Sequence, residues 1–308
     1  MQTRSTPSNQ QAYEGSWSSI EAAVADRLKT GDAGIGDILT VVDRELAGTK
    51  VGADAFRVFH GDLDAPKGPD GNGFGRVVAA YGRYQAVPPG IHGKALTDLI
   101  LQRLPADVEI VVEFGSGVGQ NLVRLALETG RTDIRYIACE LTESGRRVTD
   151  RMAALMPAYA IETVAFDYND WDFSFLDAGA RAFAFTHFSI EQISDIQASL
   201  FEDLIDRCGA VSAMHLEPCG WQRFVKLRAW YDHARQSGTK PSHRIEAKEE
   251  QFSRNAAFWA IQHSYNRNLL EVIAALRNSG RIEVLEQVMD YYGSNPFHPG
   301  TLIHWTKQ

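Results

Sequence analysis

The sequence predicts an α/β fold, in which a doubly wound sheet of seven strands ends in an antiparallel hairpin and follows an N-terminal helical region. From residue 108 onward, five short apolar runs alternate with segments of helical periodicity. That alternation is typical of a parallel sheet with helices on both faces. Two more apolar runs, 282–292 and 301–307, flank the turn-rich stretch SNPFHPG and predict the hairpin.

The expected parallel strands and helices follow one another along the chain. The strands are 108–114, 134–141, 161–166, 181–188 and 210–216, and the helices are 119–129, 142–156 and 190–206. After the polar stretch 236–250 a single long helix is expected, because apolar residues recur at helical spacing from Phe258 to Leu276. We expect that helix to end near Ser279.

The first hundred residues lack this alternation. Residues 1–14 are polar and without periodicity, so a disordered tail is expected there. Residues 15–105 are expected to form a helical lid region, because apolar residues recur every four positions at Ile20, Val24 and Leu28 and again at Ile38, Val42 and Leu46. Within this region the Gly-, Asp- and Pro-rich stretch 61–73 predicts a long loop. Residues 106–308 then form a ligand-binding domain, with 220–255 as an insertion.

Composition limits the function classes. The 308 residues are 44% hydrophobic and carry a net charge of -8 without a Lys- or Arg-rich run, which argues against a nucleic-acid partner. Neither a signal peptide nor an apolar stretch near the ~20 residues that span a bilayer is present. Cys139, Cys208 and Cys219 form no paired motif, which suits a reducing compartment and predicts no zinc site. We expect a cytoplasmic protein without a membrane partner.

The stretch 108-VEIVVEFGSGVGQNLVRLAL-127 joins a strand to a helix through three closely spaced glycines. Bare backbone at such a turn lets a nucleotide approach the start of the helix. Glu140 closes the next strand, where an acidic side chain would hold ribose hydroxyls. The dinucleotide pattern G-x-G-x-x-G needs glycine at position 120, which is Gln, and the P-loop pattern is also absent.

The motif E-F-G-S-G-V-G resembles the [ED]-x-G-x-G-x-G motif of class I S-adenosylmethionine-dependent methyltransferases, over roughly residues 108–307. The resemblance implies a Rossmann-like fold, S-adenosyl-L-methionine as cofactor, and a ribose contact from Glu140. It also implies an adenine contact from Asp167, with Tyr168 stacked nearby. The expected cofactor-binding residues are Glu113, Gly115, Ser116, Gly117, Gly119, Glu140, Leu141, Asp167, Tyr168, Thr186 and, from the lid, Tyr84.

Polar residues gather where the fourth and fifth strands end. His187 and Glu191 follow one strand and His215 and Glu217 the other, so parallel strands bring them to one edge as candidate catalytic residues. Methyl transfer from a sulfonium needs alignment and, for some acceptors, a base, but no metal. Three of these four residues have a structural alternative: Glu191 as a solvated first-turn residue, and both histidines as hydrogen-bonded strand residues. Glu217 precedes Pro218 at a strand end, where packing does not explain a glutamate, and is expected to be functional. Glutamates at the site favour a cationic acceptor.

The expected function is therefore methylation of a small molecule, leaning to N-methylation of an amine, amino acid or guanidine. O-methylation stays open as an alternative. Two other classes also stay open: an NAD(P)-dependent oxidoreductase, against which the glycine spacing weighs, and a non-catalytic scaffold that kept the fold. The N-terminal helices offer a surface for a homodimer, which no motif specifies.

Overall fold

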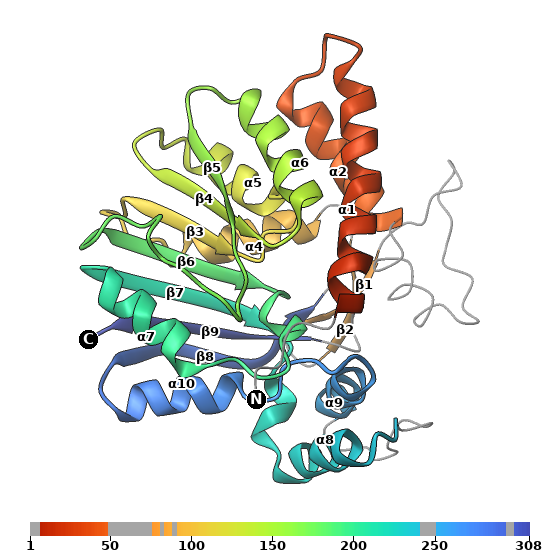
Figure 1. Ribbon diagram of the computed structural model, residues 1–308, viewed down its shortest axis with the longest axis vertical. Coiled ribbons are helices and arrows are strands. Elements are labelled where there is room, and N and C mark those ends of the chain that lie inside the picture. The colour runs from red at the N-terminus through yellow and green to blue at the C-terminus, as the bar shows by residue number, and fades with distance from the viewer. Residues whose placement is uncertain (1–6, 49–75, 81–82, 88–90, 241–250, 294–298) are drawn as a thin grey trace. The chain divides into compact units, whose positions relative to one another are not determined.

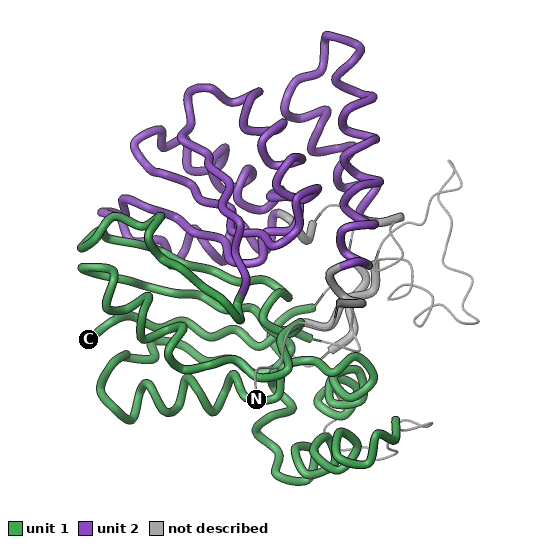
Figure 2. Tube along the Cα trace, in the orientation of Figure 1, with its two compact units in different colours: residues 1–5, 77–85, 168–308 green, residues 6–76, 86–167 purple. Residues whose placement is uncertain are grey.

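The computed structural model describes residues 7–48, 76–80, 83–87, 91–240, 251–293 and 299–308. Two compact units make up the chain, and Figure 2 shows them in different colours. Unit 1 comprises residues 1–5, 77–85 and 168–308, and unit 2 comprises residues 6–76 and 86–167.

Unit 2 contains the first three parallel strands and their helices (Figure 1). They are β3 (Ile110–Phe114), α5 (Gln120–Thr129), β4 (Arg135–Glu140), α6 (Glu143–Ala154) and β5 (Ala160–Ala165), preceded by α4 (Ile91–Leu101). β4 lies between β3 and β5, with Phe114 beside Cys139 and Glu140 beside Ala165. All five residues of β3 are buried, as is typical of a parallel strand whose two faces are both covered.

Two N-terminal helices belong to the same unit, α1 (Pro7–Leu28) and α2 (Ile35–Gly48). α1 packs against α2 and α6, and Ile20, Val24, Ile38 and Val42 are buried. The tail predicted to be disordered over 1–14 is helical from Pro7 onward. Proline suits a first helical position because its missing amide would have no partner there.

Unit 1 contains the remaining expected strands. They are β6 (Arg181–His187), β7 (Ala210–Glu217), β8 (Ile282–Gly293) and β9 (Gly300–Lys307). β6 and β7 are parallel, while β9 lies between β7 and β8 and is antiparallel to both. The predicted Rossmann-like class with an antiparallel C-terminal hairpin is therefore confirmed, and every expected strand is present.

Two short strands were not expected. They are β1 (Arg76–Ala80) and β2 (Arg83–Val87), within the region predicted to be helical. β1 pairs antiparallel with β8, with Ala79 beside Gly293. The described chain thus has nine strands instead of seven. A five-residue run such as RVVAA, next to glycines, is too short to reveal its partner, because pairing with β8 is a contact distant in sequence.

The helices of unit 1 differ from the prediction at two places. They are η1 (Ile190–Gln192), α7 (Ala198–Arg207), η2 (Gly220–Arg223), α8 (Val225–Ser237), α9 (Gln251–His263) and α10 (Leu269–Asn278). A helix was predicted over 190–206, but the chain first forms the short η1, and the α-helix α7 begins only at Ala198. The single long helix is also wrong: Ser264 has a φ of 57° and breaks it, and Asn266 Oδ1 accepts the amide of Leu269 to begin α10. Within the part of the chain that the structure describes, no helix is long and apolar enough to cross a membrane.

Candidate active site

The glycine turn between β3 and α5 has a backbone that other residues rarely adopt. Gly115, Gly117 and Gly119 have φ angles of 68°, 58° and 73°, where a Cβ atom is disfavoured. The amides of Gly115 and Ser116 donate to the Cys139 carbonyl at 2.8 and 3.0 Å, and the Gly119 amide donates to the Ser116 carbonyl at 2.9 Å. We expected such amides to face a ligand, but these fasten the turn to itself and to β4.

Helix α6 packs directly against the turn. A Cβ atom at Gly119 would lie 2.3 Å from Thr149 Oγ1, and one at Gly145 would lie 2.4 Å from the Gly117 carbonyl oxygen. Both distances are too short for any real side chain, so the close approach of α6 requires glycine at both positions. The third glycine of the motif therefore serves packing, whatever ligand binds.

Glu113, at the end of β3, stabilises the glycine turn by hydrogen bonds to α5. It is 1% exposed, and its carboxyl group accepts hydrogen bonds from Asn121 Nδ2 at 3.0 Å and from the Leu122 amide at 3.2 Å. Burial raises the pKa of Glu113 to about 8. This side chain joins the end of β3 to the first turn of α5, and so holds the glycines in place.

Glu140 ends β4 beside the turn. Its Oε2 accepts the Gly117 amide at 2.9 Å, and its Oε1 accepts the amide and the hydroxyl of Thr142 at 2.9 and 2.7 Å. Burial raises the pKa of Glu140. A carboxylate accepts about four hydrogen bonds, so a further donor, such as a ribose hydroxyl, can still bind. The carbonyl of Leu141 accepts a hydrogen bond from Arg146 at 2.9 Å.

Two polar atoms beside the turn have no hydrogen-bond partner in the described structure. These are Ser116 Oγ and Gln120 Oε1, both buried. Buried polar atoms are nearly always paired, and an exception calls for an explanation such as a missing ligand or water. A hydroxyl that donates and an amide oxygen that accepts match the carboxylate and the ammonium of an amino acid. The turn therefore fits the amino-acid end of S-adenosyl-L-methionine.

The sequence did not identify Gln120 as a site residue, because Gln120 was considered only as the residue that breaks the dinucleotide spacing.

Trp17 was also not identified from the sequence. A Cβ atom at Gly117 would lie 3.3 Å from Trp17 Cζ2, so the indole of α1 rests against the turn. Tyr13 packs on Trp17 with ring centroids 5.6 Å apart. No sequence pattern links an N-terminal tryptophan to a glycine a hundred residues later.

Acidic side chains fasten α1 to α6. Glu14 accepts the amides of Glu143 and Ser144 at 3.1 and 3.2 Å, and so caps the start of α6. Glu21 accepts two hydrogen bonds from Arg147, at 2.9 and 2.8 Å, and one from Arg151 at 2.9 Å. The hydrogen bond from Arg147 is the main cause that lowers the pKa of Glu21. α1 is thus held beside the turn by charged contacts.

In unit 1, a buried chain of polar groups joins β6, β7 and β9. Thr186 Oγ1 lies 3.0 Å from His215 Nδ1, and Trp305 Nε1 donates to His215 Nε2 at 2.9 Å. Because Nε2 accepts, Nδ1 carries the proton and donates to Thr186. Burial lowers the pKa of His215 to about 3. With both ring nitrogens engaged and the ring 2% exposed, His215 has the geometry of a core histidine, as the structural alternative expected.

Glu217 is engaged in a similar way. It is 1% exposed, and its carboxyl group accepts the amides of Ser189 and Ile190 at 3.1 and 3.2 Å and that of Glu191 at 3.3 Å. Burial, with a smaller contribution from the neighbouring Glu191, raises the pKa of Glu217 to about 8. The side chain therefore caps η1 and fixes the loop that follows β6.

His187 and Glu191 lie on that loop. His187 is half-buried at the end of β6, directly before Phe188, whose φ of 53° marks a strained backbone. Glu191 is 8% exposed and accepts a hydrogen bond from Gln192 at 2.9 Å. A small pocket with room for about one water molecule is lined by Ile190, Glu191, Glu217, Pro218, Cys219, Tyr265, Asn266 and Leu269.

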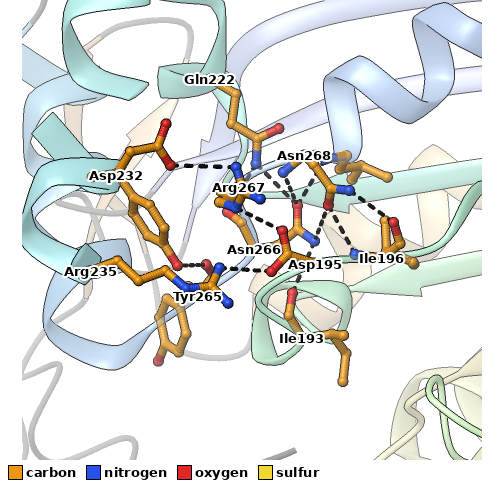
Figure 3. A network of polar contacts seen from close by, with 12 residues as sticks. Ile193, Asp195, Ile196, Gln222, Asp232, Arg235, Tyr265, Asn266, Arg267 and Asn268 are labelled. Carbon is orange, nitrogen blue, oxygen red and sulfur yellow. Dashed lines mark hydrogen bonds and ion pairs between the residues drawn. The ribbon is translucent and has the colours of Figure 1, made fainter. Parts of the chain in front are cut away.

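Asn266 connects the loops of this edge (Figure 3). Its Nδ2 donates to the Ile193 carbonyl at 2.9 Å, its amide donates to the Glu191 carbonyl at 2.8 Å, and its Oδ1 accepts from Gln222 Nε2 at 3.1 Å. Figure 3 also shows Asp195 between Arg235 and Arg267, each at 2.7 Å. The loops after β6 and β7 and the start of α10 are therefore held together by one polar network, which sequence reasoning did not foresee.

The remaining predicted residues lie as follows. Asp167 is half-buried, two residues beyond the end of β5. Tyr168 is buried, with its hydroxyl 2.8 Å from Ser189 Oγ. The side chain of Tyr84 lies outside the described residues, although its backbone belongs to β2.

Neither a metal nor a thiol centre is found in the described ranges. They hold no group of three or more His, Cys, Asp or Glu residues arranged to bind a metal. Cys139, Cys208 and Cys219 are buried free thiols, and burial raises the pKa of Cys208 to about 11. A thiol with a raised pKa is a poor nucleophile at neutral pH.

The sequence matches no protein-family model and no curated protein. Several solved structures are similar in fold. A SAM-dependent methyltransferase from Aquifex aeolicus is 13% identical with a TM-score of 0.41, over 69% of this chain and 89% of that one. Geranyl diphosphate C-methyltransferase from Streptomyces coelicolor A3(2) is 11% identical with a TM-score of 0.46, over 72% and 82%. The [4+2]-cyclase SpnF is 11% identical with a TM-score of 0.44, over 83% and 92%. Since one fold hosts several chemistries, function has to be argued from the site.

Proposed function

We propose that the chain is an S-adenosyl-L-methionine-dependent methyltransferase that acts on a small molecule. This proposal depends on one observation. The glycine turn has two polar atoms without a hydrogen-bond partner, Ser116 Oγ and Gln120 Oε1, and it lies beside Glu140 at the end of β4. An amino-acid group at the turn and a ribose at Glu140 are the two ends that this cofactor presents. A dinucleotide would instead present a diphosphate, for which the turn offers no free amide at Gly115, Ser116, Gly117 or Gly119.

The cofactor, when bound, supplies an activated methyl group on a sulfonium with a neutral leaving group. The chain has to bind, orient and shield it. Glu140 would accept the ribose hydroxyls, Ser116 and Gln120 would hold the amino-acid end, and Trp17 would exclude water above Gly117. Orientation of this kind supplies several kcal/mol of barrier reduction, up to ~7–11 in intramolecular reactions.

On the acceptor side we propose N-methylation of an amine, amino-acid or guanidine-type compound. Glu191 supports this proposal, because it lines the small pocket and a glutamate favours a cationic acceptor. Glu217 gives no support, since three backbone amides use its carboxyl group. His187 is the candidate base, because it is half-buried at the end of β6, whereas His215 has no free nitrogen. A base contributes roughly 10²–10⁴ in rate when the acceptor must lose a proton.

Calorimetric titration with S-adenosylhomocysteine and, separately, with NADH tests the cofactor assignment. We expect saturable binding of S-adenosylhomocysteine alone. Glu140→Gln should weaken it by about tenfold or more, since hydrogen bonds to a charged group contribute ~1.5–3 kcal/mol. Glu128→Gln, an exposed glutamate on α5, should bind normally. Binding of NADH alone would contradict the proposal.

Methyl transfer itself is tested with a labelled methyl donor and fractionated small metabolites. The expected result is a mass gain of one methyl group in an amine-containing compound. A gain on a hydroxyl instead would shift the assignment to O-methylation. Cofactor binding without transfer to any fraction would favour the non-catalytic scaffold.

A further inference from the structure

Helix α9 carries a group of buried hydrogen-bond donors without acceptors. Nε and Nη1 of Arg254, Nδ2 of Asn255 and Nε1 of Trp259 are buried and have no hydrogen-bond partner among the residues described. Asn255 is 6% exposed, and Trp259 lies one turn further along the same face. All four atoms are N–H donors.

Such donors are costly in the free protein. Arg254 as a whole is half-buried, but two of its three guanidinium nitrogens are buried without an acceptor, and a buried donor that lacks a partner destabilises the fold. Among the described residues Asp290 pairs with Arg223 and not with Arg254: its Oδ2 is bound by Arg223 at 3.0 Å and by Ser253 at 3.2 Å, and its Oδ1 is buried without a partner. The unpartnered atoms of these three residues are all donors, so a ligand group that pairs with them has to offer acceptors.

The start of α9 is fixed at the ligand-binding edge of the strands in unit 1. Ser253 Oγ donates to Asp290 near the end of β8. β8 and β7 run in the same direction, since both are antiparallel to β9. The end of β8 therefore shares an edge with Glu217 at the end of β7, and ligands of α/β folds bind beyond such strand ends.

The rest of α9 is held by packing, which fixes the direction in which each face of the helix points. Ala256, Ala257 and Ala260 are fully buried against Trp221 and Tyr231. A helix anchored on that face by small residues cannot rotate without opening the cluster. The arrangement thus exists before any ligand binds, which reduces the entropy cost of binding.

We propose that Arg254 and Asn255 bind an anionic, oxygen-bearing group of the methyl acceptor, either a carboxylate or a phosphate. This assignment rests on the proposed function. Arg254 supplies a planar pair of donors that matches two oxygens of such a group, and Asn255 adds a neutral donor. Together with an amine near Glu191, a carboxylate would make the acceptor resemble an amino acid.

The experiment measures melting temperature against sodium phosphate, sodium acetate and sodium chloride at one ionic strength. We expect phosphate or acetate to raise the melting temperature saturably above chloride. A response to phosphate alone identifies a phosphate site, and a response to acetate identifies a carboxylate site. If neither anion differs from chloride, the proposal is wrong.

Variants make the test specific. Arg254→Met should weaken anion binding by roughly tenfold or more, while the melting temperature in chloride rises, because two buried donors without acceptors are gone. Asn255→Asp should also weaken binding, since it opposes the anion with like charge. Arg277→Met, which replaces an exposed arginine on α10, should change neither. A lower melting temperature for Arg254→Met in chloride, or unchanged anion binding, would show that Arg254 is structural.

Titration of S-adenosylhomocysteine with and without saturating phosphate or acetate separates acceptor from cofactor. Unchanged affinity supports an acceptor site. Competition would assign the anion site to the carboxylate of the cofactor and overturn the inference. Anion binding by a protein that does not bind S-adenosylhomocysteine would refute the proposed function and leave the anion site standing.

Discussion

Replacing Glu217 by Gln should change how stability depends on pH. Burial raises the pKa of Glu217, and that of Glu113, from 4.5 to about 8. Between these values the folded chain keeps protons that the unfolded chain releases. The free energy of unfolding should therefore fall as pH rises from about 4.5 to about 8.

The magnitude follows from the size of the shift. Each fully shifted group lowers the free energy of unfolding by up to ~1.4 kcal/mol for each pH unit in that window. Glu217→Gln removes one of these groups and should make the slope less negative by up to ~1.4 kcal/mol for each pH unit. His215, whose pKa burial lowers from 6.5 to about 3, adds an opposite slope below pH 6.5 in both proteins. The variant also places a donor against the Glu191 amide, which Glu217 Oε2 now accepts at 3.3 Å. That mismatch costs about 1–3 kcal/mol, whereas titration of Glu217 costs the wild type up to ~5 kcal/mol by pH 8. The variant should therefore be less stable than the wild type at pH 5 and more stable at pH 8.

Urea unfolding at pH 5, 6, 7 and 8, followed by tryptophan fluorescence, measures both effects. Glu283→Gln, an exposed glutamate on β8, should give a curve parallel to that of the wild type. If Glu217→Gln also runs parallel to the wild type, the buried carboxyl group does not titrate as inferred and the reasoning fails.

Two further outcomes are expected. Gly119→Ala should lower the free energy of unfolding by about 2–5 kcal/mol, because the cost of the positive φ and the cost of the clash with Thr149 add together. Gly130→Ala, with a φ of 61° but nothing within 4 Å, should cost only ~1–2 kcal/mol in the same denaturant assay; equal losses would exclude the packing argument. Glu21→Gln should speed amide hydrogen exchange in α1, whereas Asp26→Asn, which affects an exposed pair, should not; equal exchange would show that the arginines do not hold α1.

Residue periodicity and glycine placement determined the fold class. The apolar runs from β3 to β9 were visible because most of these strands carry contiguous buried side chains, namely β3, β4, β6, β7 and β9. The glycine turn and Glu140 were also visible, because strand, turn and helix are contiguous in the chain. What the pattern did not give is the role of each group, such as the packing of Gly119 on Thr149.

Only the tertiary structure decided which polar residues are free to act. His215 and Glu217 lose their hydrogen-bonding capacity to Trp305 and to the amides of η1, which are distant from them in sequence. Ser116 and Arg254 keep unpartnered donors for the same reason. A side chain's chemistry comes from its sequence, but its available protons and lone pairs depend on neighbours that only folding brings within hydrogen-bond distance.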